Sequence, residues 1–150
     1  MNKVFGFVGK FFDKRIYVFG VLFAALLGFD LIAIKYYLYW HYRWIDIPVH
    51  FLGGFFLGAL FFYIVFSNPR TKKMLGLART NKNIFWVSVG LVFLAAVGWE
   101  VVEWVVGRTS WSPAYVPDTT LDLIAGTGGG YLFYLFYGAV RDMIRNDLVL

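Results

Sequence analysis

The chain has 150 residues, of which 60% are hydrophobic, 22% aromatic and only 15% charged, whereas a water-soluble domain has about 45–50% apolar and about 25% charged residues. With a mean hydropathy of +0.66 and a net charge of +5, the sequence predicts one integral membrane domain over residues 1–150 and excludes disordered tails and a nucleic-acid partner. The absence of cysteine excludes disulfides, thiolate metal ligands and a cysteine nucleophile.

The first predicted element is a short amphipathic helix over residues 1–14. Phe5, Val8 and Phe11 fall near one helical face of this segment, whereas its lysines lie elsewhere. This pattern is typical of helices that lie in the headgroup region of a bilayer. A frayed basic tail is the alternative interpretation of the same residues.

Four apolar segments follow, and each has about the 20 residues that a membrane-spanning helix needs. Their length and continuous apolarity predict helices rather than barrel strands, which would alternate over about 10 residues. We expect an all-α polytopic membrane protein, a four-helix bundle whose spans cover about residues 16–39, 47–66, 84–106 and 118–140.

The lysines and arginines predict the orientation of these spans, because cytoplasmic loops are enriched in both. Eleven of the fourteen lie before the first span, between the second and third spans, or after the fourth. Arg43 and Arg108 lie in the two other loops, and Lys35 lies within the first span. We therefore expect a multi-pass protein of a bacterial or archaeal cell (inner) membrane, with both termini in the cytoplasm.

The ionisable residues of the spans gather near one end of the predicted bundle. At about 1.5 Å rise per residue, they lie within roughly 4–12 Å of the outer ends of their spans. Spacings of three or four residues place them in pairs on helix faces: Asp46 with His50, Glu100 with Glu103, and Asp118 with Asp122. Buried charges are costly in a membrane and mark functional sites, so we interpret these six residues as a polar cup that opens outward. Asp30 lies at a similar depth in the first span.

Glycines continue two of these helix faces toward the middle of the membrane. Two follow His50 and two follow Asp122, each at intervals of four residues: Gly54, Gly58, Gly126 and Gly130. Small residues at such spacing let helix backbones approach closely, so we expect these four to be structural packing residues. Their contact would close the floor of the polar cup, which argues against a simple pore.

Several of these residues also have structural interpretations. Asp46 and Asp118 each lie close to a proline at the start of a span, where helix N-caps belong. Asp30 and Lys35 could form a structural ion pair near the interface. For the other members of the polar cup, the alternative is a hydrogen-bond network that only holds the helices together.

The charge of the polar cup needs to be neutralised. Its five carboxylates carry −5 and few basic residues lie near them, so protons or metal ions must compensate. An oxygen-rich set with one imidazole suits a divalent metal ion such as Mg²⁺, Mn²⁺, Ca²⁺, Fe²⁺ or Zn²⁺. The candidate metal ligands are Asp46, His50, Glu100, Glu103, Asp118 and Asp122, and the candidate catalytic bases are His50 and Glu103.

Three sequence blocks carry a resemblance to known families: Asp46-Ile-Pro-Val-His50-Phe-Leu-Gly-Gly, Trp99-Glu100-Val-Val-Glu103-Trp104, and Asp118-Thr-Thr-Leu-Asp122-Leu-Ile-Ala-Gly126. Their order and helical placement resemble the YjdF-type small bacterial inner-membrane proteins, whose function is unassigned. They are more loosely similar to the VanZ-like family, which is associated with glycopeptide resistance. The resemblance covers the second to fourth spans and implies a shared site at the six residues of the polar cup, but no known reaction.

Two main classes of function are compatible with these patterns. An enzyme would use a metal in the polar cup to activate water against a phospho- or acyl-linkage of a lipid or lipid-linked envelope precursor. A binding or transport protein would hold a divalent cation or relay protons there, and because four short helices form only a small transporter, this alternative requires a homo-oligomer. A third alternative is an accessory subunit whose polar network fixes its helix packing.

Overall fold

The computed structural model describes residues 14–107 and 115–147, and every regular element within them is helical. The amphipathic helix predicted over residues 1–14 therefore lies outside the described residues except for its last position. The α-helices are, in chain order, α2 (Lys14–Lys35), α3 (Leu38–His41), α4 (Asp46–Phe62), α5 (Pro69–Leu75), α6 (Asn81–Phe85), α7 (Leu91–Val105) and α8 (Tyr115–Asp147). Three further helical segments are the 3-10 helix η1 (Arg43–Ile45) and the π-helical η2 (Tyr63–Ser67) and η3 (Trp86–Gly90).

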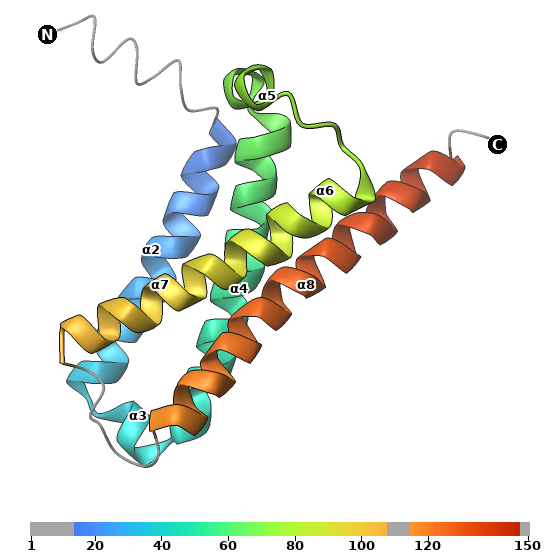
Figure 1. Ribbon diagram of the computed structural model, residues 1–150. Coiled ribbons are helices and arrows are strands. Elements are labelled where there is room, and N and C mark those ends of the chain that lie inside the picture. Colours follow the sequence, from blue (N-terminus) through green and yellow to red (C-terminus); the bar gives the residue numbers. More distant parts are fainter. Residues whose placement is uncertain (1–13, 108–114, 148–150) are drawn as a thin grey trace, which may run out of the picture.

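Within the described residues, four helical stretches are long and apolar enough to cross a membrane: Tyr17–Lys35, Asp46–Ser67, Asn81–Val105 and Val116–Asp142. They confirm the predicted all-α polytopic fold. The stretches alternate in direction, so that the start of α2, the helix α5 and the end of α8 share one end of the bundle (Figure 1). The helix α3, the end of α7 and the start of α8 lie at the other end. We call these the α5 end and the α3 end.

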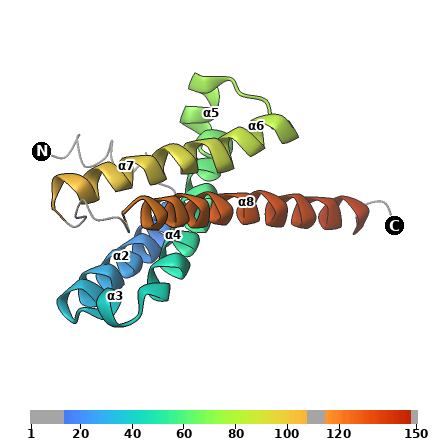
Figure 2. The same cartoon turned by 60° about the horizontal axis from the view of Figure 1, so that its bottom comes forward.

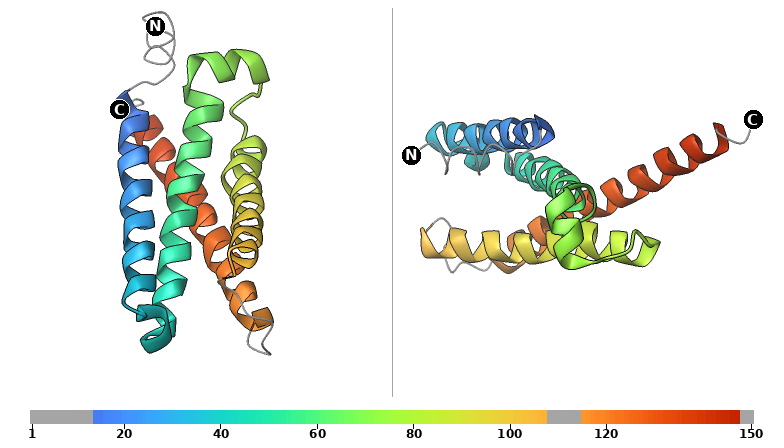
Figure 3. Two further views of the ribbon diagram at one scale, coloured as in Figure 1. Left: turned by 90° about the vertical axis from the view of Figure 1, so that its left-hand side faces the viewer. Right: turned by 90° about the horizontal axis from the view of Figure 1, so that it is seen from above.

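The bundle is built around the pair formed by α4 and α8, which pack against each other more extensively than any other two helices. Seen from above, α2 and α7 lie on opposite sides of this pair (Figure 3). The helix α2 packs mainly against α4 and the neighbouring α3, and only 6% of its spanning window is buried. Its remaining surface is therefore left for lipid.

The span predicted over residues 16–39 is wrong at its end, because α2 stops at Lys35. Tyr36 and Tyr37 form a turn, and Tyr37 has a φ of 54°, a left-handed conformation that does not continue an α-helix. The short helix α3 then lies beside the ends of α2 and α4 (Figure 2). Tyrosines are apolar enough to extend a hydropathy window, but both of these side chains are exposed.

Two pairs of facing glycines set the close approach of α4 and α8. A Cβ atom added to Gly54 would collide with the carbonyl oxygen of Gly126 and lie 2.7 Å from its carbonyl carbon. One turn further along, a Cβ atom on Gly58 would lie 3.3 Å from the Cα atom of Gly130. Both pairs lie where the sequence places its glycine stripes, and backbone meets backbone at each of them.

A third contact of this kind involves a glycine outside the predicted stripes. A Cβ atom on Gly129 would collide with the carbonyl oxygen of Phe51 and lie 2.6 Å from the amide nitrogen of Phe55. Gly129 follows Asp122 by seven residues, which is two turns of a helix with 3.6 residues per turn. The stripe counted by fours therefore misses it, although it lies on the same helix face.

Aromatic and branched side chains form the buried core nearer the α5 end: Phe62, Val65, Phe66, Ile84, Val87 and Phe133. The rings of Phe62 and Tyr137 lie 4.3 Å apart between their centroids, which ties the end of α4 to the second half of α8. The core and the polar cup thus occupy different halves of the bundle.

The second span ends with its carbonyl groups satisfied by side chains of the following segment. Thr71 donates its hydroxyl hydrogen to the carbonyl oxygen of Ile64, and Arg79 Nη2 donates to that of Phe66 at 2.6 Å. The last carbonyls of a helix have no partner within the helix, and unpaired ones are costly near lipid. These bonds therefore hold α5 and the segment after it against the end of the span.

Candidate metal centre

Three ligand-type side chains from two helices meet at the α3 end. His50 Nε2 lies 3.4 Å from Asp46 Oδ1 and 3.8 Å from Asp122 Oδ1. One nitrogen or oxygen of each residue lies within 4.8 Å of those of the other two. Asp46 and His50 are one turn apart on α4, whereas Asp122 reaches them from α8. The crossing of the two helices therefore builds the cluster, which we call the Asp–His–Asp cluster.

Exposure decreases across the Asp–His–Asp cluster from its mouth to its base. The side chain of Asp46 is 30% exposed, that of His50 is 12% exposed, and that of Asp122 is 6% exposed. Asp46 opens α4 at the α3 end, and His50 lies about 6 Å further along the helix axis. The Asp–His–Asp cluster is thus most accessible at Asp46 and most buried at Asp122.

Glycine directly beneath the cluster lets the two helices bring these side chains together. Gly126 follows Asp122 by one turn, and a Cβ atom there would lie 3.8 Å from the carbonyl oxygen of His50 and 3.5 Å from the Ala96 side chain of α7. A Cβ atom would therefore make ordinary van der Waals contacts, but a longer side chain would push α8 away from both neighbours. The same contacts that place Asp122 beside His50 also close the floor below them.

The acids of α7 flank the Asp–His–Asp cluster without belonging to it. Glu100 is 7% exposed, hydrogen-bonds with Thr119 of α8 and interacts electrostatically with His50. Glu103 also interacts electrostatically with His50. Neither glutamate is among the atoms that lie within 4.8 Å of one another. The structure therefore gathers both predicted α7 ligands beside the cluster and leaves their role as ligands a prediction.

Asp118 lies on the exposed side of α8, one turn before Asp122. Its side chain is exposed, and it is close enough to Glu100 and Asp122 to raise the negative potential there. Like Glu103 and Glu100, it is outside the Asp–His–Asp cluster. Its part in metal binding stays a prediction.

The N-cap interpretations of Asp46 and Asp118 are wrong. The residue that caps α4 is Ile45, no side chain caps this helix, and Asp46 is already helical. The preceding 3-10 helix leads directly into α4, so Asp46 never adopts the extended backbone of an N-cap. Asp118 lies in the first turn of α8, which begins at Tyr115. Both carboxylates instead lie near a helix N-terminus, where negative charge is favourable.

Asp30 belongs to a different part of the α3 end. Tyr39 donates its hydroxyl hydrogen to Asp30 Oδ1 at 3.0 Å, which joins the last turns of α2 to α3. Lys35 Nζ lies 5.8 Å from the centroid of the Tyr36 ring. The predicted Asp30–Lys35 pair stays a prediction, and the bond from Tyr39 gives Asp30 a structural role that the sequence pattern did not indicate.

Thr119 is the site residue that the sequence interpretation missed. Its hydrogen bond with Glu100 links α7 to α8 beside the cluster. The available signal was its position three residues before Asp122, a spacing that shares a helix face. A neutral hydroxyl carries no cost signal in a membrane span, so the ionisable residues alone do not indicate it.

Comparison with known proteins identifies a family but no reaction. Residues 11–143 match the family described as "Predicted membrane protein (DUF2238)". No curated protein and no solved structure matches the chain. The matched region contains the four spans and the whole Asp–His–Asp cluster, so the description agrees with the fold and leaves the chemistry to be argued from the residues.

Proposed function

Because the chain belongs to the DUF2238 family of predicted membrane proteins, we propose that it binds a divalent metal ion at Asp46, His50 and Asp122 and uses it to hydrolyse a lipid or lipid-linked envelope precursor. The Asp–His–Asp cluster carries this proposal. Its three ligand atoms lie within 4.8 Å of one another, so one ion can contact all of them after small side-chain adjustments. Two carboxylates and one neutral imidazole suit Mg²⁺, Mn²⁺, Ca²⁺, Fe²⁺ or Zn²⁺.

The number of protein ligands favours catalysis over a structural metal site. Catalytic metal centres commonly have three protein ligands and leave a position for water, whereas structural sites are closed. The side chain of Asp46 is 30% exposed, so water and a lipid headgroup can reach an ion bound there. A bound divalent ion lowers the pKa of its water and supplies a nucleophile near neutral pH.

His50 and Glu103 have different roles in the proposed reaction. His50 acts as a ligand, because it lies between Asp46 and Asp122, and this leaves Glu103 as the general base. In the proposed step, water attacks the phosphorus or carbonyl carbon and gives its proton to Glu103. The ester bond to the leaving oxygen breaks, and that oxygen takes the proton from Glu103. Glu100 and Asp118 are second candidates for metal contact.

The proposal includes an orientation and a location. With eleven basic residues on one side of the spans, the positive-inside rule puts the α5 end and both termini in the cytoplasm. The cup then opens at the outer surface of a bacterial or archaeal cell (inner) membrane, at the depth of lipid headgroups. This arrangement supports a lipid or lipid-linked substrate.

Transport of cations or protons is supported less well. The close contact of Gly54 with Gly126 closes the floor beneath the cup, so a path across the membrane would need these helices to separate or a homo-oligomer to supply a second route. An accessory subunit with a structural polar network predicts neither bound metal nor turnover. The two alternatives therefore differ from the proposal in measurable ways.

Elemental analysis of detergent-purified protein tests the metal site first. We expect about one divalent metal ion per chain in the wild type and in Asp142→Asn, whose residue lies on α8 far along the chain from the cluster, and loss of the metal in His50→Ala. Hydrolysis of phospholipids or lipid-linked pyrophosphates should follow the metal content and stop with a chelator. Metal-free wild-type protein that cannot be loaded with any divalent ion would disprove the proposal.

The variant Glu103→Gln tests whether metal binding and catalysis depend on different residues. This variant should retain the metal of the wild type and lose about 10²–10⁴-fold in turnover, the usual contribution of a general base. Loss of metal together with activity would make Glu103 a ligand instead. Cation flux in proteoliposomes without any turnover would support transport.

A further inference from the structure

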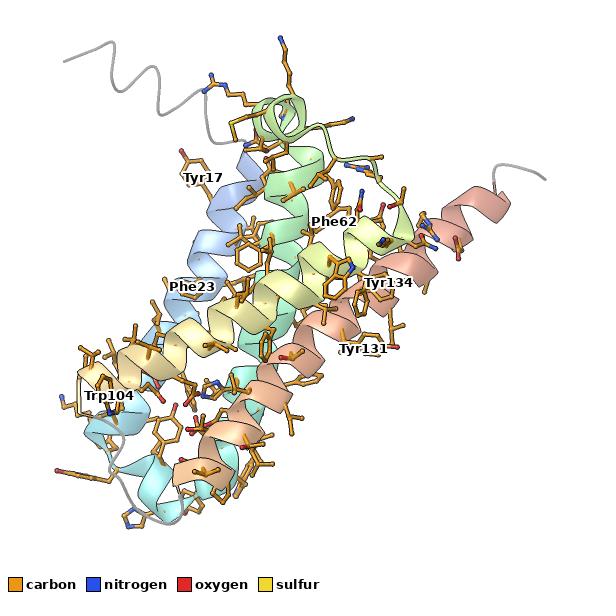
Figure 4. All side chains as sticks on the ribbon, in the orientation of Figure 1. Tyr17, Phe23, Phe62, Trp104, Tyr131 and Tyr134 are labelled. Atoms are coloured by element: carbon orange, nitrogen blue, oxygen red, sulfur yellow. The ribbon has the colours of Figure 1, made fainter. Side chains whose placement is uncertain are left out.

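An apolar groove lies at the α5 end, in the opposite half of the bundle from the polar cup. It encloses about 390 Å³ between α2, the second span and the second half of α8, within the roughly 300–1,000 Å³ of typical ligand pockets. Its lining includes Val18, Phe19, Ala59, Phe62, Ser67 and Tyr137. Tyr17 and Phe62 lie in this half of the molecule and Trp104 lies toward the α3 end (Figure 4).

The groove exists because α2 is held loosely at this level. The rings of Phe19 and Tyr63 are 6.0 Å apart between centroids, whereas α2 has little other buried surface. Ala59 is the small residue on the opposing wall. Within the hydrocarbon region, such an apolar space suits a lipid acyl chain better than water, because water would gain no hydrogen bonds there.

A basic side chain lies at the rim of the groove. Arg79 Nη2 donates to Ser67 Oγ at 3.1 Å, and the guanidinium carbon of Arg79 lies 5.5 Å from the centroid of the Phe62 ring. Both Ser67 and Phe62 line the groove. Among the described residues, the hydrogen bonds of Arg79 use only Nη2, so the N–H groups of Nε and Nη1 are available to an anion.

The sequence adds further positive charge at the same end of each wall. Arg15 precedes Phe19 by four residues, Arg70 follows Ser67 by three, and Arg141 follows Tyr137 by four. These spacings correspond to about one helical turn. Arg141 is partly neutralised by Asp142 at 3.1 Å, whereas Arg79 contacts two residues of the groove lining, Ser67 and Phe62. The apolar walls and the basic rim match the two parts of an anionic phospholipid.

We propose that the groove between α2, the second span and α8 binds an anionic phospholipid, with an acyl chain beside Ala59 and Phe62 and the phosphate group against Arg79. This site is independent of the polar cup and of the hydrolase proposal, since it shares no residue with either. Its occupant would fill the space that α2 leaves and stabilise the packing of α2 on the bundle.

Native mass spectrometry of the full chain in detergent tests this site with two probes, phosphatidylglycerol and phosphatidylcholine with identical acyl chains. The wild type should bind phosphatidylglycerol more tightly. Arg79→Gln should weaken its binding about fivefold, the effect expected for one basic side chain near an anionic lipid, whereas Lys73→Gln on exposed α5 should have little effect. Arg79→Lys should retain most of the preference, because it keeps the charge while altering the bonds to Phe66 and Ser67.

A second pair of variants tests the acyl-chain part. Ala59→Phe should fill the groove and reduce binding of both lipids, whereas Ala24→Phe, at an exposed position of α2, should not. Equal affinity of the wild type for the two lipids would overturn the proposal, because only annular lipid or detergent would then occupy the groove. Arg79→Gln binding as tightly as Lys73→Gln would overturn it as well, and this result does not depend on how well Ala59→Phe folds.

Discussion

At the scale of single residues, a substitution at Asp122 distinguishes between a metal site and a hydrogen-bond network. If the Asp–His–Asp cluster binds metal, a hundredfold excess of the ion over its dissociation constant should add about 2.7 kcal/mol to stability. A chelator should then lower the melting temperature of the wild type, and one divalent ion should restore it. Asp122→Asn keeps the shape of the side chain, so we expect it to fold and to lose this response. Asp142→Asn, far along the same helix from the cluster, is the matched control.

Acid should act in the same direction as the chelator. Carboxylates and imidazole bind metal only when they are deprotonated, so the stabilisation by metal should be complete at neutral pH and decrease as the pH falls. A hydrogen-bond network predicts instead that Asp122→Asn is at least as stable as the wild type, because an amide can replace a protonated carboxyl at Asp122. Thermal stability that ignores chelator and added ions at every pH would exclude the metal.

The sequence predicted that ionisable residues gather at one end of the bundle, but not which of them contact one another. Spacing along α4 puts Asp46 and His50 on one face, and hydropathy marks both as costly charges in a span. Which acid of another helix reaches His50 depends on the crossing of α4 and α8, which no spacing within one helix specifies. Asp122 therefore meets His50 at 3.8 Å, whereas the glutamates of α7 lie beside the cluster.

At the scale of elements, adjacent glycines on α4 provide a matched test of the helix crossing. A Cβ atom at Gly54 would collide with the backbone of Gly126, whereas one at Gly53 would have no other atom within 4 Å. Gly54→Ala should destabilise the protein by about 1–3 kcal/mol, the usual cost of overpacking, or prevent folding. Gly53→Ala should leave stability unchanged or slightly higher, because alanine favours helix.

Thermal unfolding in one detergent, followed by circular dichroism, measures this difference. Gly126→Leu should resemble Gly54→Ala and should also weaken metal binding, since it lies directly under His50. Gly20→Leu, on a helix where the added atom meets nothing within 4 Å, should have a milder effect. Equal stability of Gly53→Ala and Gly54→Ala would show that the two helices do not cross at these glycines in the membrane.

The spans themselves follow from hydropathy to within a few residues, with one informative exception. Continuous apolarity marks the spans that begin at Asp46, Asn81 and Val116 because each is surrounded by lipid or by other helices. The first span was extended too far, since a left-handed turn at Tyr37 leaves no trace in hydropathy. The π-helical segments also leave no trace in hydropathy, because one extra residue in a turn changes the backbone hydrogen bonding and not the apolar composition.

At the scale of the whole molecule, the two ends of the bundle have different chemistry. The α3 end contains a group of acids around His50, and the α5 end contains basic side chains beside an apolar groove. Glycine contacts in the middle separate the two regions. A bundle with this asymmetry has a defined orientation in the membrane, so the proposed lipid chemistry depends on which end faces outward.

Single cysteines test that orientation, and the natural absence of cysteine makes each variant unambiguous. Tyr42→Cys lies at the α3 end and Lys73→Cys lies on α5, and both positions are exposed. In intact cells, a membrane-impermeant maleimide should label Tyr42→Cys and should label Lys73→Cys only after the membrane is permeabilised, because the positive-inside rule keeps the α5 end in the cytoplasm. The reverse pattern would turn the cup toward the cytoplasm and make inner-leaflet lipids its only accessible substrates. The phospholipid groove would then lie in the outer leaflet with its binding residues unchanged, since that inference depends on the basic end and not on which side of the membrane it faces.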